Sequence, residues 1–197
     1  LNTTSVQINL DYTSLEDAEK LAFVSDCLHP FIALIFANTP FYRGAPAGRN
    51  NMREIIWRNT DPSRSNCLFD HGITSTDGLL EKFVSYVLNT PTLFTLEKDG
   101  SFGTYEGAIG DWLGSLDDRG TLESNNIMTA LHQIFTQVRF KHVLEIRSPD
   151  RPPFGHELAP AAFFQGILRS PDTLEKVMEI CAKWSSGDRN KLNELAQ

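Results

Sequence analysis

The sequence is poor in cysteine, in positive charge and in long apolar runs, and each shortage excludes a class of protein. Its three cysteines stand far apart and form no paired motif, which argues against a disulfide framework and against a zinc site. Eighteen lysines and arginines against 25 acidic residues leave a formal charge of −7, which suits neither nucleic acid nor an anionic membrane. The longest apolar run, residues 31–37, is too short to cross a bilayer.

What remains is the composition of an ordinary globular protein, in which 41% of the 197 residues are hydrophobic and 22% are charged. We therefore predict a soluble protein of one domain, residues 1–197, that acts on small molecules. Cysteines in the reduced state predict a cytoplasmic location. The chain begins at Leu1 and a strand pattern follows within a few residues, so we interpret it as a piece of a longer polypeptide.

The most informative stretch is residues 141–150, where apolar and charged side chains alternate. Neighbouring side chains of a strand point to opposite faces, so the apolar positions share one face while Glu145 and Arg147 share the other. This charged pair is either a solvated surface contact of little energetic value or part of a catalytic site. Arg139 and Lys141 add positive charge nearby, with a solvated edge as the alternative.

Two further stretches carry polar side chains on a defined face. Residues 5–12 show a period of two, so Gln7 and Asn9 project together from one strand face, either into solvent or towards a ligand. In a short helix after the loop of residues 41–51, Arg53 and Trp57 are four residues apart and share a face. That pair is either a plain cation–π contact or part of a binding site.

The remaining pattern predicts an α+β protein with an antiparallel sheet. Further strands are expected over residues 92–97 and 138–147. Helices are expected over residues 13–35, 52–58, 79–88, 105–113, 127–135, 156–168 and 170–181, and from about residue 188 to the end. Pro30 should bend the first helix, His29 beside it is expected to be structural, and Gly187-Asp188 should separate the last two helices.

Four stretches match a known family in the same order along the chain. They are Leu144-Glu145-Ile146-Arg147 with Asp150, residues 5–12, residues 37–41 with Gly44 and Gly48, and residues 52–57 with Asn59-Thr60-Asp61-Pro62. Together they resemble the glutamate-cysteine ligases of the plant and proteobacterial type. The chain is similar to the C-terminal half of such an enzyme, which implies part of a glutamine-synthetase-like catalytic domain.

The resemblance implies ligation of the γ-carboxylate of glutamate to the amine of cysteine, the first step of glutathione synthesis. A carboxylate acylates an amine only after conversion to a better leaving group, and ATP would supply this through an acyl phosphate. Magnesium accompanies ATP because its phosphates need a hard cation. ATP, Mg²⁺, glutamate and cysteine are thus the expected cofactors and small-molecule partners.

The same resemblance assigns roles to individual residues. Glu145 would bind the metal, and Arg147 would act in catalysis by stabilising charge on the phosphoryl group. Arg53 would hold the substrate glutamate because its planar fork suits a carboxylate, with Trp57 as a wall of the pocket. Gln7 and Asn9 are further candidates for substrate binding.

The sequence also departs from the family pattern. One glutamate is a poor magnesium site, and the other magnesium-binding carboxylates of the family lie upstream of this chain. We therefore expect the chain alone to be inactive and its missing N-terminal half to be its partner. Ser148-Pro149 stands where plant enzymes resemble Gly-Ala, and no cysteine pair matches the plant redox switch.

Two other functions stay open. The chain could belong to a carboxylate-amine ligase with another amine acceptor, because no residue identifies a thiol pocket. It could also be a catalytically silent homologue that serves as a binding or subunit module.

Overall fold

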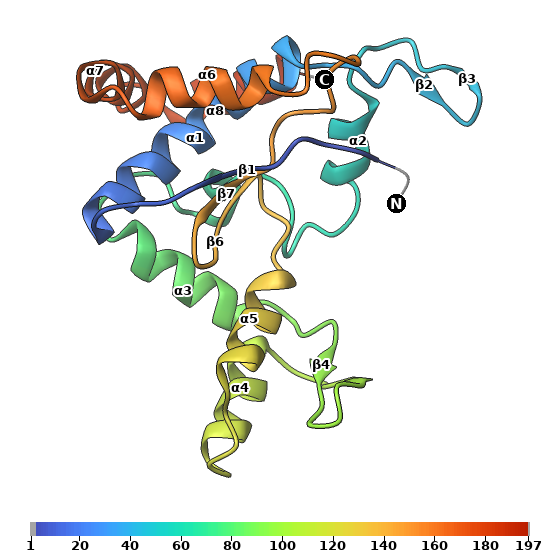
Figure 1. Ribbon diagram of the computed structural model, residues 1–197, viewed down its shortest axis with the longest axis vertical. Coiled ribbons are helices and arrows are strands. Elements are labelled where there is room, and N and C mark those ends of the chain that lie inside the picture. The colour runs from blue at the N-terminus through green and yellow to red at the C-terminus, as the bar shows by residue number, and fades with distance from the viewer. Residues whose placement is uncertain (1–2, 197) are drawn as a thin grey trace.

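The computed structural model describes residues 3–196 and places a three-stranded sheet against a long central helix (Figure 1). The strands β1 (Ile8–Leu10), β7 (Leu144–Ile146) and β6 (Val138–Phe140) lie in the order β1-β7-β6 and are antiparallel throughout. The helix α1 (Leu15–Ile35) packs against β6 and β7. The predicted α+β class with an antiparallel sheet is confirmed, and so is the strand pair within residues 138–147.

Shorter elements complete the chain. The other helices are α2 (Met52–Arg58), the 3₁₀ turn η1 (Leu68–His71), α3 (Leu79–Asn89), α4 (Ile109–Asp117), α5 (Ser124–His132), α6 (Ala159–Leu168), α7 (Pro171–Cys181) and α8 (Ser186–Leu195). Two small hairpins pair β2 (Phe41–Tyr42) with β3 (Ala45–Pro46) and β4 (Thr95–Leu96) with β5 (Phe102–Gly103).

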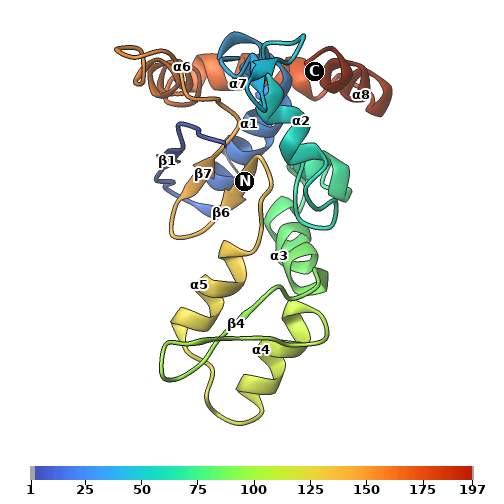
Figure 2. The same ribbon diagram turned by 90° about the vertical axis from the view of Figure 1, so that its right-hand side faces the viewer.

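The central helix α1 is enclosed on several sides. The sheet lies on one side of it, while α7 and α8 pack on the other, with α6 against α7 (Figures 1 and 2). Residues 21–30 are all buried as a result. Buried polar groups need hydrogen-bond partners: the Ser25 hydroxyl donates to the Leu21 carbonyl oxygen within α1, while other polar side chains of this stretch must reach other elements. Asp26 and His29 do so, and these two contacts organise the polar interior described below.

The sheet has the two faces that the alternation predicts. Its apolar residues face α1 and are buried: Ile8, Leu10, Val138, Phe140, Leu144 and Ile146. The opposite face brings Asn9, Glu145 and Arg139 into one row across the three strands. Arg139 is only 6% exposed and Glu145 only 3%, so the alternative of a solvated edge is wrong for Arg139.

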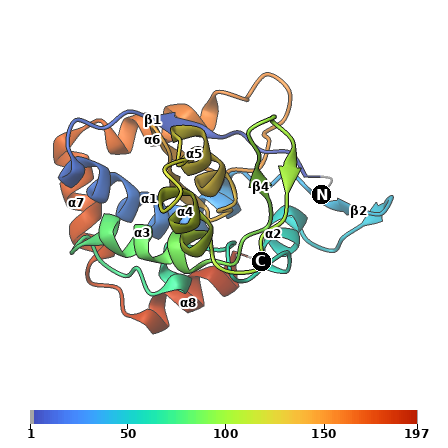
Figure 3. The same ribbon diagram turned by 90° about the horizontal axis from the view of Figure 1, so that it is seen from below.

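Helices α3, α4 and α5 and the β4–β5 hairpin form an arm that extends away from α6, α7 and α8 (Figures 1 and 2). Helices α3 and α4 cross closely at Gly110, where an added Cβ would lie 2.9 Å from the carbonyl oxygen of Leu88. The β2–β3 hairpin projects from the opposite end of the molecule (Figures 1 and 3).

Several predicted boundaries are wrong for local reasons. Residues 41–51, expected as a loop, contain the β2–β3 hairpin. The helix expected over residues 105–113 is α4, which begins later because Asp111 accepts a hydrogen bond from the Ala108 N–H at 3.1 Å. Gly187 lies inside α8, since the hydroxyl of Ser185 caps that helix. Across residues 3–196, no helix has the length and apolar character to span a membrane.

Candidate functional site

Glu145 lies at the centre of a buried cluster of positive charge. Its Oε2 is 2.5 Å from Arg139 Nε and 3.5 Å from an Arg147 guanidinium nitrogen, and its Oε1 is 2.9 Å from Lys141 Nζ. Burial pushes the pKa of Glu145 upwards, but hydrogen bonds and charge from Lys141 and Arg139 outweigh it and lower the pKa. The carboxylate is therefore ionised and holds three cations in place.

Arg147 is buried between this carboxylate and an aromatic ring. Its guanidinium carbon lies 5.4 Å from the centroid of the Trp57 ring, which packs edge-on against Phe135 at 5.8 Å. Burial, followed by repulsion from Arg139, lowers the pKa of Arg147 to about 10, so the group stays protonated at neutral pH. Trp57 thus takes part in a cation–π contact, but with Arg147 and not with Arg53.

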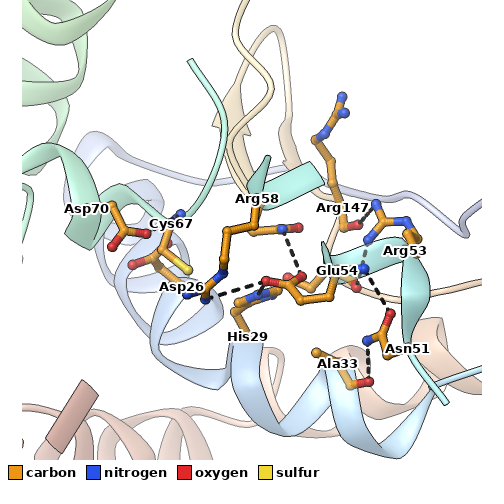
Figure 4. A network of polar contacts seen from close by, with 12 residues as sticks. Asp26, His29, Ala33, Asn51, Arg53, Glu54, Arg58, Cys67, Asp70 and Arg147 are labelled. Carbon is orange, nitrogen blue, oxygen red and sulfur yellow. Dashed lines mark hydrogen bonds and ion pairs between the residues drawn. The ribbon is translucent and has the colours of Figure 1, made fainter. Parts of the chain in front are cut away.

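Arg53 holds the end of β7 through the main chain. Its guanidinium donates to the carbonyl oxygen of Arg147 at 2.8 Å and to that of Ser148 at 3.4 Å, and the residue is 3% exposed. Figure 4 shows the Arg147 side chain pointing away while its carbonyl meets Arg53. Among the described residues, Arg53 Nε has no hydrogen-bond acceptor. One N–H of the group is therefore buried without a partner among the described residues.

A second buried carboxylate, Glu54, connects α1, α2 and the sheet. Its Oε1 lies 3.2 Å from His29 Nε2 and 3.7 Å from Arg58, while Gln137 donates to its Oε2 at 3.4 Å (Figure 4). Burial raises the pKa of Glu54, but the charges of His29, Arg58 and Arg53 outweigh it and lower the pKa. His29 is therefore a partner of an ionised acid, consistent with its predicted structural role.

The sequence analysis did not single out Glu54, although a local signal was available. Asn51 caps α2 by accepting the Glu54 N–H at 3.0 Å, and its amide donates to the Ala33 carbonyl at 2.6 Å. An asparagine three residues before a glutamate is typical of a helix start. The cap fixes where α2 begins and so which way Arg53 and Glu54 point.

Gln7 and Asn9 lie on the same polar face as the cation cluster. Asn9 stands opposite Glu145 in the register, and Gln7 directly precedes the paired residue Ile8, which stands opposite Ile146. Both amide side chains belong to exposed residues. Asn9 thus lies beside Glu145 on the outer strand, and the substrate-binding role of Gln7 and Asn9 stays a prediction.

Arg53, Glu145 and Arg147, the three charged residues predicted for the site, do not line one common cavity. A cavity of about 480 Å³ lies between α2 and the β2–β3 hairpin, lined by Thr3, Thr39, Phe41, Tyr42, Arg43, Met52, Arg53 and Ile56. Neither Glu145 nor Arg147 lines it. Arg53 and Arg147 are still close enough for the charge of Arg53 to help lower the pKa of Arg147. Main chain at the end of β7 separates the two guanidinium groups.

The residues present do not complete a magnesium site. Within the described part of the chain, no three His, Cys, Asp or Glu side chains are grouped so that they could hold a metal ion. The single negative charge of Glu145 is already shared among three cations, so this carboxylate alone does not make a metal site. Oxygen ligands from outside this chain would be needed.

The site as a whole carries excess positive charge in an acidic protein. Five cationic side chains, Arg53, Arg58, Arg139, Lys141 and Arg147, lie near three carboxylates, those of Glu54, Glu145 and Asp150. Desolvated guanidinium groups with unused donors suit anionic ligands such as carboxylates and phosphates. The arrangement can bind and orient anions and can stabilise negative charge that develops on them.

Comparison with known proteins agrees with this chemistry. A model of glutamate-cysteine ligase family 2 (GCS2) matches residues 1–196. The chain is 33% identical over 200 residues to the chloroplastic glutamate–cysteine ligase of Arabidopsis thaliana, covering 98% of this chain and 37% of that protein. It is 32% identical over 198 residues to the chloroplastic enzyme of Nicotiana tabacum, covering 96% and 37%. The chain thus spans well under half the length of these relatives.

The names of these relatives also correct one prediction. They place the relatives in the chloroplast, so the cytoplasmic location predicted from the cysteines is wrong. Free thiols indicate reducing surroundings but do not distinguish one reducing compartment from another. The family match extends over nearly the whole chain, which therefore belongs to glutamate-cysteine ligase family 2.

Proposed function

We propose that this chain is part of an enzyme that joins the γ-carboxylate of glutamate to the amine of cysteine at the expense of ATP. Family membership supports the reaction class. The observation that carries the proposal is Arg147, a buried cation held by Glu145 and Trp57. Such a cation can stabilise charge on a transferring phosphoryl group and on the acyl phosphate that cysteine then attacks.

Arg53 has a double task in this proposal. It fixes the main chain that carries Arg147, and it lines the cavity that would receive a carboxylate of the substrate glutamate. Trp57 is the wall on which Arg147 rests. Gln7 and Asn9 contribute amides from the neighbouring strand, where exposure leaves them free to face a ligand.

Magnesium is proposed for the whole enzyme, with Glu145 as the ligand that this chain would contribute. The remaining oxygen ligands would come from the N-terminal half of the same protein, so the chain alone would be inactive. Residues 1–197 would then be one unit, the C-terminal portion of a glutamine-synthetase-like catalytic domain. The match covers 37% of each of these relatives, which supports the proposal that the chain is part of a longer enzyme.

The test is an assay of ADP release by the full-length protein in which this sequence occurs. Glutamate-dependent release that cysteine accelerates is the expected result. Acceleration by a different amine would favour a ligase with another acceptor. No release under any condition would favour a silent homologue that acts as a binding module.

A variant links the assay to the site. Arg147→Lys should lower kcat by about 10²-fold or more, because a point charge cannot reproduce the planar donor fork. Arg119→Lys, on an exposed residue of the distant arm, is the matched control and should leave kcat unchanged. Equal activity of the two variants would remove Arg147 from the catalytic site.

A further inference from the structure

The three cysteines of the chain, far apart in sequence, gather around one buried ion pair. Arg189 of α8 donates to Asp26 of α1 at 2.6 Å, and both residues are buried. Cys27 follows Asp26 in α1. The Asp26 carboxylate also accepts a hydrogen bond at 2.7 Å from the main-chain N–H of Leu68, the residue after Cys67. Figure 4 shows Asp26 beside Cys67. Cys181 ends α7, which packs on α1. All three thiols are free and buried.

Two of these thiols touch each other. Cys27 and Cys181 lie within hydrogen-bonding contact across the packed α1–α7 pair. Their hydrogen bond raises the pKa of Cys27 and lowers the pKa of Cys181, and the positive charge of Arg189 also lowers the pKa of Cys181. Of the two thiols, Cys181 is therefore the one whose ionisation is favoured.

Cys181 also has access to a small cavity, which Cys27 and Cys67 do not line. The cavity has a volume of about 270 Å³ and is bordered by Cys181, Arg189, Trp184 and the polar segment of residues 74–76. Arg189 is 6% exposed, and one of its terminal N–H groups has no hydrogen-bond partner within residues 3–196. Arg189 therefore brings positive charge to the wall of the cavity, and the size of the cavity excludes a protein-sized oxidant.

We propose that Cys181 is a peroxide-reactive thiol and that Cys27 resolves its oxidised form into a disulfide joining α1 to α7. The sulfur of Cys181 attacks one oxygen of hydrogen peroxide, the O–O bond breaks, and the thiol proton leaves with the second oxygen as water. The sulfur of Cys27 then attacks the Cys181 sulfenic acid. The S–S bond forms, the S–O bond breaks, and the proton of Cys27 completes a second water.

The experiment treats the reduced chain, freed of reductant, with hydrogen peroxide and follows intact mass and non-reduced peptide maps. The wild-type chain should lose the mass of two hydrogen atoms and yield one linked pair of peptides that contain Cys27 and Cys181. The cross-link should raise Tm by about 6–12 °C. In Cys27→Ala, Cys181 should instead gain one oxygen and react with dimedone.

Matched variants separate this proposal from general thiol oxidation. Cys181→Ala should leave Cys27 unmodified, and Cys67→Ala should form the same disulfide as the wild type. Burial holds the pKa of Cys67 well above its ordinary value, so this thiol should resist peroxide. An unchanged wild-type mass, or oxidation of Cys67 as fast as Cys181, would overturn the proposal. Should either alanine variant fail to fold, the peptide map of the wild type decides.

Discussion

Replacement of Glu145 by glutamine removes the one negative charge that three buried or half-buried cations share. Glu145→Gln keeps the shape of the side chain but leaves Arg139, Lys141 and Arg147 without a counter-ion at 2.5, 2.9 and 3.5 Å. Breaking a buried ion pair from one side costs about 3–5 kcal/mol. The amide still accepts one hydrogen bond, so we expect a loss near the lower limit, about 3 kcal/mol.

For a chain of this size that loss corresponds to a fall in Tm of about 6–12 °C. Urea and thermal unfolding at neutral pH measure it directly. Glu16→Gln is the matched control, because Glu16 forms an ion pair with Lys20 at 2.7 Å while its side chain is 76% exposed. Surface pairs of this kind contribute little, so the control should unfold like the wild type.

A double variant checks the electrostatic cause. Adding Arg139→Gln to Glu145→Gln removes one of the cations left unpaired, so the double variant should be less destabilised than the sum of the single ones. Equal stability of the Glu145→Gln and Glu16→Gln variants would refute the reasoning. So would a magnesium-dependent rise in Tm seen for the wild-type chain but not for Glu145→Gln, since Glu145 would then hold a metal within this chain.

Three further predictions concern stability. The pKa of Glu54 lies below its ordinary value of 4.5, so the stability that its contacts provide is complete above pH 4.5 and lost as pH falls through the lower folded-state pKa. Tm against pH should show this loss, and Glu54→Gln should make it shallower. Gly110→Ala should destabilise the folded chain by about 1–3 kcal/mol, because the new Cβ would meet the Leu88 carbonyl. Gly114→Ala, in open space on the same helix, should stabilise the folded chain by about 0.5–1 kcal/mol. Urea titration measures the sign of both changes. Arg53→Lys should cost about 2 kcal/mol in the same titration, because an ammonium group cannot hold both carbonyls.

Local patterns allowed much of the secondary structure to be predicted. The alternation of apolar and polar residues in 5–12 and 141–150 predicted a sheet with one apolar and one polar face. The structure has both faces, because successive side chains on a strand point to opposite sides. Ser14 caps α1 by accepting the Asp17 N–H at 3.1 Å, as its position before an acidic turn predicts. The helix α1 continues through Pro30 to Ile35, so this proline does not end it, and the bend expected there stays a prediction.

The sequence by itself determined the class of fold, the strand that carries Glu145 and Arg147, and the family, because alternation and motif order are properties of neighbouring residues. Only the tertiary structure decided which charges meet. Arg147 rests on Trp57, Arg53 binds the main chain after β7, and the Cys27 thiol reaches that of Cys181. Such contacts join residues that are far apart in the chain, and they follow from how α1 is enclosed and not from any local pattern.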